Sequence, residues 1–116
     1  MVLAGTATPA LAATETTGVV CSYQLTAWQG GFMAEVSIAN SGPPINGWVV
    51  HWTFAAPTTI TTVWSAQIAQ NASGVTATNM FYNPLIGTGV SASFGWNGLA
   101  ATTEVPTDLT INGRPC

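Results

Sequence analysis

The 116 residues of this sequence are enough for one domain with a modest hydrophobic core and too few for a second. Only 4% of them are charged, against roughly 25% in an ordinary soluble domain, and the net charge is −3. With a single basic residue, the chain has no positive surface for nucleic acid or for an anionic membrane, so its composition favours an uncharged partner.

The first residues are typical of the end of a secretory signal peptide. A stretch of apolar and small residues leads to Ala10-Leu11-Ala12, which has the small-x-small pattern of a cleavage site. The basic residues that should precede it are missing, which indicates that Met1 is a truncated or misassigned start. The alternative is a disordered tail rich in Ala and Thr. Both interpretations leave residues 1–17 outside the fold and predict a domain over 18–116, and the first predicts a secreted, extracellular protein.

The predicted domain begins with three strands, and helix signals are nearly absent from it. The first strand covers Val19–Trp28 and ends at a Gln-Gly-Gly turn. The second, Phe32–Ala39, places every other residue on one apolar face, and a turn rich in Gly and Pro follows it. The third, Trp48–Phe54, alternates in the same way and is closed by Pro57.

Shorter runs complete the domain. Further strands are predicted at Thr58–Ser65, Gln67–Gln70, Gly74–Asn79, Val90–Trp96 and Asp108–Ile111. The segment Met80–Gly89 is predicted to be a loop, and Asn97-Gly98 is predicted to be a turn. Short strands separated by Gly, Pro and Asn are typical of a sandwich, so we expect an all-β fold of about eight or nine strands in two packed antiparallel sheets.

Two cysteines, Cys21 and Cys116, lie at the two ends of the predicted domain. In a chain with a predicted export signal, this arrangement favours one disulfide between the ends, and the alternative is two free buried thiols. A metal site is not expected, because zinc needs several Cys or His ligands and His51 is the only histidine. We expect no cofactor.

Some of the aromatic residues are predicted to lie in the core. The chain has five Trp, four Phe and two Tyr. Trp48 and Trp52 share an apolar strand face with Phe54, so they are assigned to the core. Trp96 shares a face with Phe94, which places it in the core or half-buried.

Three other rings have polar neighbours instead. Trp28 shares a strand face with Thr26 and stands beside a turn, Trp64 shares a face with Thr62, and Tyr82 lies in the predicted loop. Large aromatic residues on polar faces usually mark an interaction site, so we expect these three to be exposed and functional. The alternative is that one or more of them only covers the edge of a sheet.

Exposed flat rings are suited to flat sugars. A β-linked glucan presents its axial C–H groups on the faces of a ribbon and its hydroxyls at the sides, so an indole or phenol ring covers apolar surface. At about 25 cal/mol per Å², a ring that buries on the order of 100 Å² contributes about 2–3 kcal/mol before the cost of association. Coplanar rings can therefore hold an uncharged polysaccharide without any ion pair.

Short motifs along the chain support this interpretation. They are Ala27-Trp28-Gln29-Gly30-Gly31-Phe32, Asn46-Gly47-Trp48, Val63-Trp64-Ser65, Asn79-Met80-Phe81-Tyr82-Asn83, Phe94-Gly95-Trp96-Asn97-Gly98 and Leu109-Thr110-Ile111-Asn112-Gly113-Arg114-Pro115-Cys116. In combination they resemble the family 2 carbohydrate-binding modules, the bacterial cellulose-binding domains of secreted cellulases and xylanases. The resemblance covers residues 19–116 and implies an immunoglobulin-like sandwich, an end-to-end disulfide and a flat face of three aromatic rings.

The resemblance also assigns the binding residues. They are Thr26, Trp28, Thr62, Trp64, Tyr82, Asn83 and Asn97. Among the polar residues that flank the binding face, Asn97 is retained, whereas positions that are commonly amides are Thr26, Thr62, Glu35 and Ser93 here. Because Tyr82 is smaller than the usual Trp and several amides are replaced, we expect weaker binding than in a member with three Trp.

The resemblance favours crystalline cellulose over xylan. In the xylan-binding branch of the family the first surface Trp is missing, and an Arg turns the second ring out of the plane. Here Trp28 is present, no Arg follows Trp64, and Arg114 is the only arginine. Xylan and chitin remain the alternatives.

A catalytic role is not expected, and no catalytic residue is assigned. A glycosidase needs two carboxylates that flank the bond, whereas Glu35, Glu104 and Asp108 are interpreted as solvated groups. A better rival is an adhesion or protein-interaction sandwich, since such folds carry many functions. We expect a monomer that binds insoluble polysaccharide and that a longer chain can join to a glycoside hydrolase.

Overall fold

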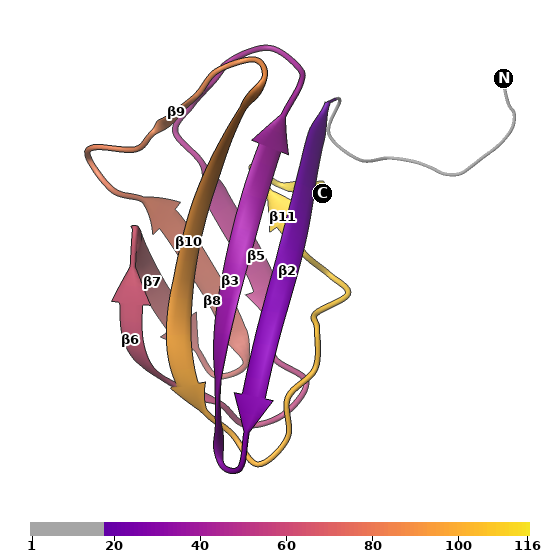
Figure 1. The fold of residues 1–116 in the computed structure, drawn as a ribbon, viewed down its shortest axis with the longest axis vertical. Coiled ribbons are helices and arrows are strands. Elements are labelled where there is room, and N and C mark those ends of the chain that lie inside the picture. The colour runs from indigo at the N-terminus through magenta and orange to yellow at the C-terminus, as the bar shows by residue number, and fades with distance from the viewer. Residues whose placement is uncertain (1–17) are drawn as a thin grey trace, which may run out of the picture.

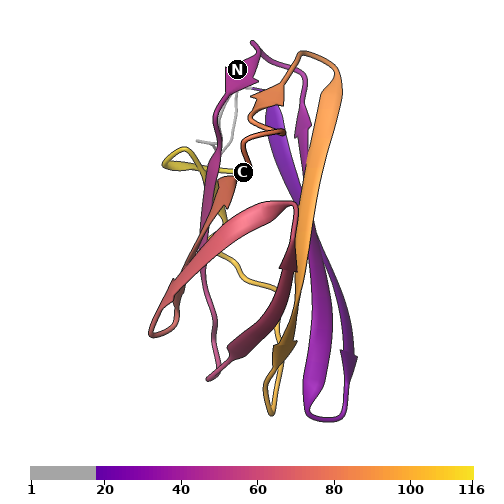
Figure 2. The same ribbon diagram turned by 90° about the vertical axis from the view of Figure 1, so that its left-hand side faces the viewer.

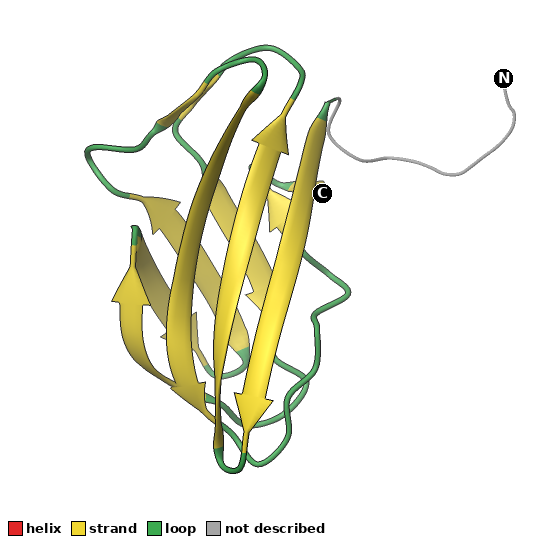
Figure 3. Cartoon of the chain, viewed as in Figure 1, coloured by secondary structure: helices red, strands yellow, loops and turns green. Residues whose placement is uncertain are grey.

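The computed structural model describes residues 18–116, and the predicted signal peptide in residues 1–17 lies outside them. The described chain is all β, which confirms the predicted fold class. Its antiparallel strands form two main sheets packed face to face, with a small third sheet at one end (Figures 1 and 3).

The first main sheet has four strands and the second has five. The four-stranded sheet has the order β2 (Val19–Trp28), β3 (Gly31–Asn40), β10 (Val90–Leu99) and β6 (Thr59–Trp64). The five-stranded sheet has the order β12 (Arg114–Pro115), β11 (Thr110–Ile111), β5 (Val49–Thr53), β8 (Gly74–Asn79) and β7 (Ala66–Asn71). The small sheet pairs β4 (Ile45–Asn46) with β9 (Leu85–Ile86).

The core lies between the two main sheets and is rich in aromatic rings. Trp48, Trp52 and Trp96 are completely buried, as the strand alternation predicts. Trp52 stacks on Trp96 with 4.6 Å between ring centroids, and Trp48 stacks on Phe94 at 5.3 Å. Within residues 18–116 the indole N–H groups of Trp52 and Trp96 have no hydrogen-bond partner, so packing rather than hydrogen bonding stabilises these two side chains in the core.

A single residue carries the chain from one main sheet to the other between β6 and β7. Ser65 lies between these strands with a φ of 64°, a left-handed conformation that L-residues rarely adopt. The result is the sharp corner seen in Figure 2, at which β7 turns away from the four-stranded sheet.

The predicted disulfide is present and joins Cys21 in β2 to Cys116, the residue after β12, with 5.2 Å between their Cα atoms. The backbone N–H of Cys21 also donates to the carbonyl of Cys116 at 3.2 Å. The sequence separation is 95 residues, and closing a loop of this length stabilises a fold by about 4–5 kcal/mol in the chain-entropy model.

Two local predictions are wrong. Asn97-Gly98 does not form a turn but lies within β10, where the pairing with β6 shifts register between the two residues. A Cβ at Gly98 would lie 2.7 Å from the Phe32 ring, so this glycine makes room for a core side chain. The predicted loop Met80–Gly89 contains β9, whose two residues are too few to show periodicity. Four such two-residue strands take the total above the predicted number.

Candidate functional site

The four-stranded sheet packs one side on the core and presents the other, here called the outer face, to solvent. Residues paired across antiparallel strands share a face, so the register gives the outer face as rows. Three successive rows are Trp28-Gly31-Leu99, Thr26-Met33-Asn97-Thr62 and Gln24-Glu35-Gly95-Trp64. The predicted residues Trp28, Trp64, Thr26, Thr62 and Asn97 therefore lie together on one surface.

Trp28 is 54% exposed and ends β2. Its indole covers Gly31, its partner across the β2–β3 hairpin, because a Cβ at Gly31 would lie 2.7 Å from the indole Nε1. With no side chain at Gly31, the ring lies down on the outer face instead of standing away from it.

Trp64 lies on the sheet in the same way. A Cβ at Gly95 would lie 2.5 Å from Cζ2 and 2.6 Å from Cε2 of this indole, so the ring covers Gly95 of the neighbouring strand. The contact explains why Trp64 is half-buried rather than fully exposed. Each of the two surface tryptophans is thus matched to a glycine on the adjacent strand.

The register also gives the separation of the two rings. Gly31 and Gly95 lie on the neighbouring strands β3 and β10, and Gly95 pairs with Glu35, four residues along β3 from Gly31. At about 3.4 Å per residue and about 4.8 Å between strands, the two indoles are about 14 Å apart. Both lie on the same side of one sheet, so a flat ligand can cover both.

Tyr82 lies outside the sheet, in the loop between β8 and β9, and is 58% exposed. This loop extends past the end of β6, where Trp64 is located (Figure 1). The following residue, Asn83, fixes the loop: its Oδ1 accepts the N–H of Met80 at 2.6 Å, and its Nδ2 donates to the carbonyl of Ser65 at 2.8 Å. Tyr82 is therefore attached to the corner that directly follows Trp64.

The polar residues of the predicted site occupy two different settings. Thr26 and Thr62 are exposed and Asn97 is half-buried, and all three lie in the row between the two indoles. Both ends of the Asn83 side-chain amide are bonded within the protein, and the backbone carbonyl of Asn83 accepts a hydrogen bond from Nε1 of the buried Trp48 at 2.8 Å. This geometry suits Asn83 for positioning Tyr82 more than for contact with a ligand.

Three exposed apolar residues near these rings were missed by sequence reasoning. Met33 is 41% exposed and Leu99 is 55% exposed on the outer face, while Phe81 is 87% exposed beside Tyr82. The alternation that buries the two neighbours of Met33 already predicts its outward direction. Phe81 lies in a loop without periodicity, so no sequence signal indicates where it points; its ring stands at 83° to that of Tyr82.

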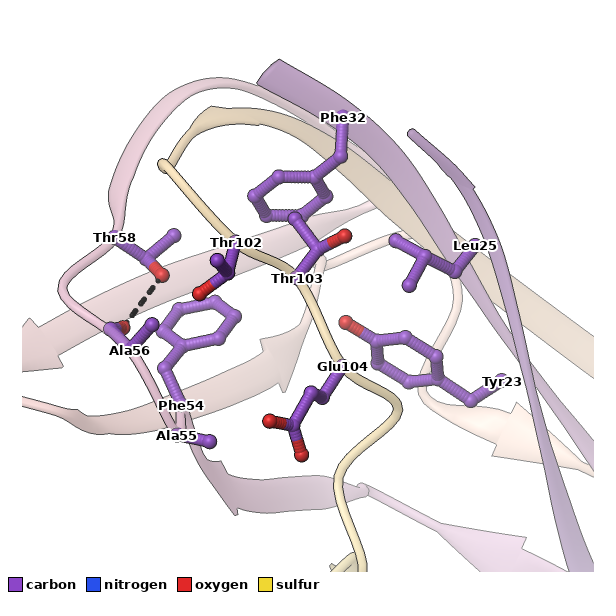
Figure 4. A pocket seen from close by; sticks show the side chains of 10 residues that line it. All are labelled: Tyr23, Leu25, Phe32, Phe54, Ala55, Ala56, Thr58, Thr102, Thr103 and Glu104. Atoms are coloured by element: carbon purple, nitrogen blue, oxygen red, sulfur yellow. Dashed lines mark hydrogen bonds between the residues drawn. The ribbon is translucent and has the colours of Figure 1, made fainter. Parts of the chain in front are cut away.

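A small cavity lies apart from the outer face. The cavity in Figure 4 lies between the ends of the main sheets and is lined by Tyr23, Phe32, Phe54 and Glu104 among others. Its volume is about 10 Å³, room for about one water molecule. Burial raises the pKa of Tyr23 well above its ordinary value, so the phenol there stays neutral. The cavity cannot hold a sugar.

The three carboxylates of residues 18–116 lie in two separate places. Glu35 lies on the outer face, whereas Glu104 and Asp108 line a shallow groove of a late loop. Burial alone would raise the pKa of Asp108, but hydrogen bonds from Thr53 and the nearby His51 lower it on balance. Asp108 therefore stays ionised and accepts the backbone N–H of Thr53 at 3.1 Å, unlike the proton-donating acid of a glycosidase.

Residues 18–116 were also searched for a membrane-spanning helix and for a metal site. This part of the chain contains no helix that could cross a membrane. It also brings together no group of three or more His, Cys, Asp or Glu side chains that could hold a metal ion.

Comparison with known proteins gives related domains. The chain is 38% identical over 111 residues to Endoglucanase CelA of Streptomyces lividans, an alignment that covers 93% of this chain and 24% of that protein. The first three curated relatives are glucanases, of which this chain spans about a quarter or less.

Two solved structures show the same fold at 29% identity. The chitin-binding domain of Chi18aC from Streptomyces coelicolor has a TM-score of 0.72, with 87% of this chain and 96% of that chain covered. The cellulose-binding family 2 domain of ScLPMO10C has a TM-score of 0.62, with 81% and 93% covered. The family model described as "Cellulose binding domain" matches residues 19–116. The chain therefore belongs to the cellulose-binding domain family and is a non-catalytic binding module.

Proposed function

We propose that the outer face binds crystalline cellulose through Trp28 and Trp64, with Tyr82 as the third ring. The observation that carries the proposal is that each indole lies on a glycine of the adjacent strand, on the same face of one sheet. Two rings held against a flat sheet match the flat faces of a crystalline glucan, in which chains lie side by side.

The affinity comes from stacking rather than from charge. Each indole covers the axial C–H groups of a sugar ring and removes apolar surface from water. The sheet holds both rings before the ligand arrives, so little side-chain entropy is lost on binding. Thr26, Thr62 and Asn97, in the row between the indoles, supply hydrogen bonds to hydroxyls at the sides of the chain, and Asn83 positions Tyr82.

Chitin is the second candidate ligand, and one observation favours it. The structure with the TM-score of 0.72 is described as a chitin-binding domain. Chitin presents the same β-linked ribbon with an acetamido group added to each ring, so stacking on Trp28 and Trp64 serves both polymers. The polar side chains between the two indoles, Thr26, Thr62 and Asn97, would then determine whether cellulose or chitin binds more tightly.

The module works as part of a larger secreted enzyme. The glucanases to which it is similar are at least about four times as long as the aligned domain, and the Cys21–Cys116 disulfide is of a kind that persists in oxidising, extracellular surroundings. In this role a monomeric module holds an attached glycoside hydrolase at the surface of an insoluble polysaccharide.

The test is an adsorption isotherm on microcrystalline cellulose, insoluble xylan and chitin. Trp28→Ala and Trp64→Ala are each expected to weaken adsorption to cellulose by at least about tenfold, with thermal unfolding monitored to show that the fold is kept. His51→Ala removes an exposed ring from the five-stranded sheet and is the matched control, expected to adsorb like wild type.

Adsorption to the three polymers distinguishes cellulose from chitin and xylan as the ligand. Stronger adsorption to chitin than to cellulose would assign the face to the second candidate. Adsorption to xylan alone, or unchanged cellulose adsorption in both Trp variants, would contradict the proposal.

A further inference from the structure

Met33 lies at the centre of the outer face, between the two tryptophans. Its row separates the row of Trp28 from the row of Trp64, and its cross-strand neighbours are Thr26 and Asn97. The side chain is 41% exposed and points away from the core, because Phe32 and Ala34 on either side of it are buried. It is therefore an apolar side chain on the surface that the ligand is proposed to cover.

The position of Met33 along β3 is midway between the two indoles. It stands two residues from Gly31, which lies under Trp28, and two residues from Glu35, which pairs with the Gly95 under Trp64. Two residues span about 7 Å of strand, so a ligand that rests on both indoles passes directly over the thioether. Leu99, in the Trp28 row, extends the apolar surface to β10.

A thioether at this place contributes in a way that the flanking Thr and Asn side chains do not. Methionine is flexible and polarisable, so it adapts to the surface laid on it and gains dispersion contact with C–H groups. Among the four residues of its row it is the apolar one, so it adds apolar surface to the strip between the two indoles. Its oxidation product, the sulfoxide, is polar and would interrupt that strip.

We propose that Met33 is a further ligand-contact residue and that its oxidation by a peroxide weakens binding. The inference rests on the proposed function of the outer face. In the reaction one peroxide oxygen is transferred to the sulfur and the O–O bond breaks. The sulfur is oxidised by two electrons to the sulfoxide, and the peroxide is reduced by two electrons and leaves as water. A bound polysaccharide covers the sulfur and slows this step.

Oxidation footprinting tests the contact in the unaltered protein. Wild type, free or adsorbed to microcrystalline cellulose, is treated with hydrogen peroxide, and sulfoxide at Met33 is followed over time by peptide mass spectrometry. Adsorption is expected to slow oxidation of Met33 by about tenfold, since burial removes access to the sulfur. Trp64→Ala, which is expected to adsorb at least about tenfold more weakly, controls for consumption of peroxide by the polymer and should show little protection at the same protein and polymer concentrations.

Two substitutions test the energetic contribution. Met33→Leu keeps a similar apolar volume but has no sulfur to oxidise, so its affinity is expected to be the same before and after peroxide treatment. Met33→Gln and the oxidised wild type are expected to bind about threefold to tenfold more weakly. Equal oxidation rates in free and adsorbed protein, or wild-type affinity in Met33→Gln, would overturn the inference while leaving the proposed function intact. Failure of the wild type to adsorb would overturn both.

Discussion

At the scale of single residues, the direction of each tryptophan decides its role. Trp48, Trp52 and Trp96 face inward and fill the core, whereas Trp28 and Trp64 face outward on the four-stranded sheet. The outward rings are not loose, because each rests on a glycine of the adjacent strand. The absence of a side chain at Gly31 and at Gly95 is therefore what allows the two indoles to lie on the outer face.

Gly31→Ala is expected to impair binding more than folding. The added Cβ would meet the indole Nε1 of Trp28 at 2.7 Å, and this tip can move because the side chain is 54% exposed. It would also lie 3.2 Å from the carbonyl oxygen of Gly98, a contact that a small backbone shift relieves. The ring then leaves the sheet, and adsorption to cellulose should fall by about tenfold while the melting temperature stays within a few degrees of wild type. The double variant Gly31→Ala/Trp28→Ala should bind like Trp28→Ala alone, and any further loss in it would contradict this mechanism.

The sequence alone predicts only part of these single-residue features. Alternation along one strand separates inward from outward residues, which is why it predicts the burial of Trp48 and Trp52. It gives no information on which residue of the next strand lies beside a ring. The pairing of Trp64 with Gly95 joins segments about thirty residues apart in the chain, and only the register of β10 and β6 supplies it.

At the scale of elements, the corner after β6 and the β8–β9 loop form one unit. Ser65 turns the chain at a positive φ, and its carbonyl accepts the side-chain N–H of Asn83 from the loop. This unit attaches Tyr82 to the end of the strand that carries Trp64. Asn83-Pro84 and the two glycines that follow indicate a loop in the sequence, but neither its bond to Ser65 nor the short strand β9 has a local signal.

Asn83→Ala tests whether this residue positions Tyr82 or contacts the ligand. The variant loses the bonds to Met80 and Ser65 and is expected to be destabilised by about 1–3 kcal/mol, measured by chemical unfolding. Its adsorption should fall no further than that of Tyr82→Ala. If Asn83 acts through Tyr82, the double variant should bind like Tyr82→Ala alone, whereas a weaker double variant would indicate a direct contact.

At the scale of the whole molecule, the fold presents a broad outer face that is nearly uncharged. The disulfide joins the first long strand to the end of the chain, and the stacked rings fill the space between the sheets. Composition alone predicts the neutral surface, and the strand pattern predicts the sandwich. The position of the proposed binding surface depends on the strand order β2-β3-β10-β6, which brings together segments distant in the sequence.

Because the outer face is nearly uncharged, its affinity for a polysaccharide should depend little on the salt concentration. Among the three rows of the outer face, Glu35 is the only charged residue, and neither cellulose nor chitin supplies an opposite charge. Raising NaCl from 0.05 to 1 M screens charge interactions and slightly favours apolar burial, so the affinity for cellulose should change by less than about twofold. A partner held by ion pairs would instead be released over this range, because the attraction between exposed charges is screened. Adsorption isotherms at the two salt concentrations distinguish these cases, and a tenfold loss of affinity at high salt would show that charge, not stacking, holds the ligand.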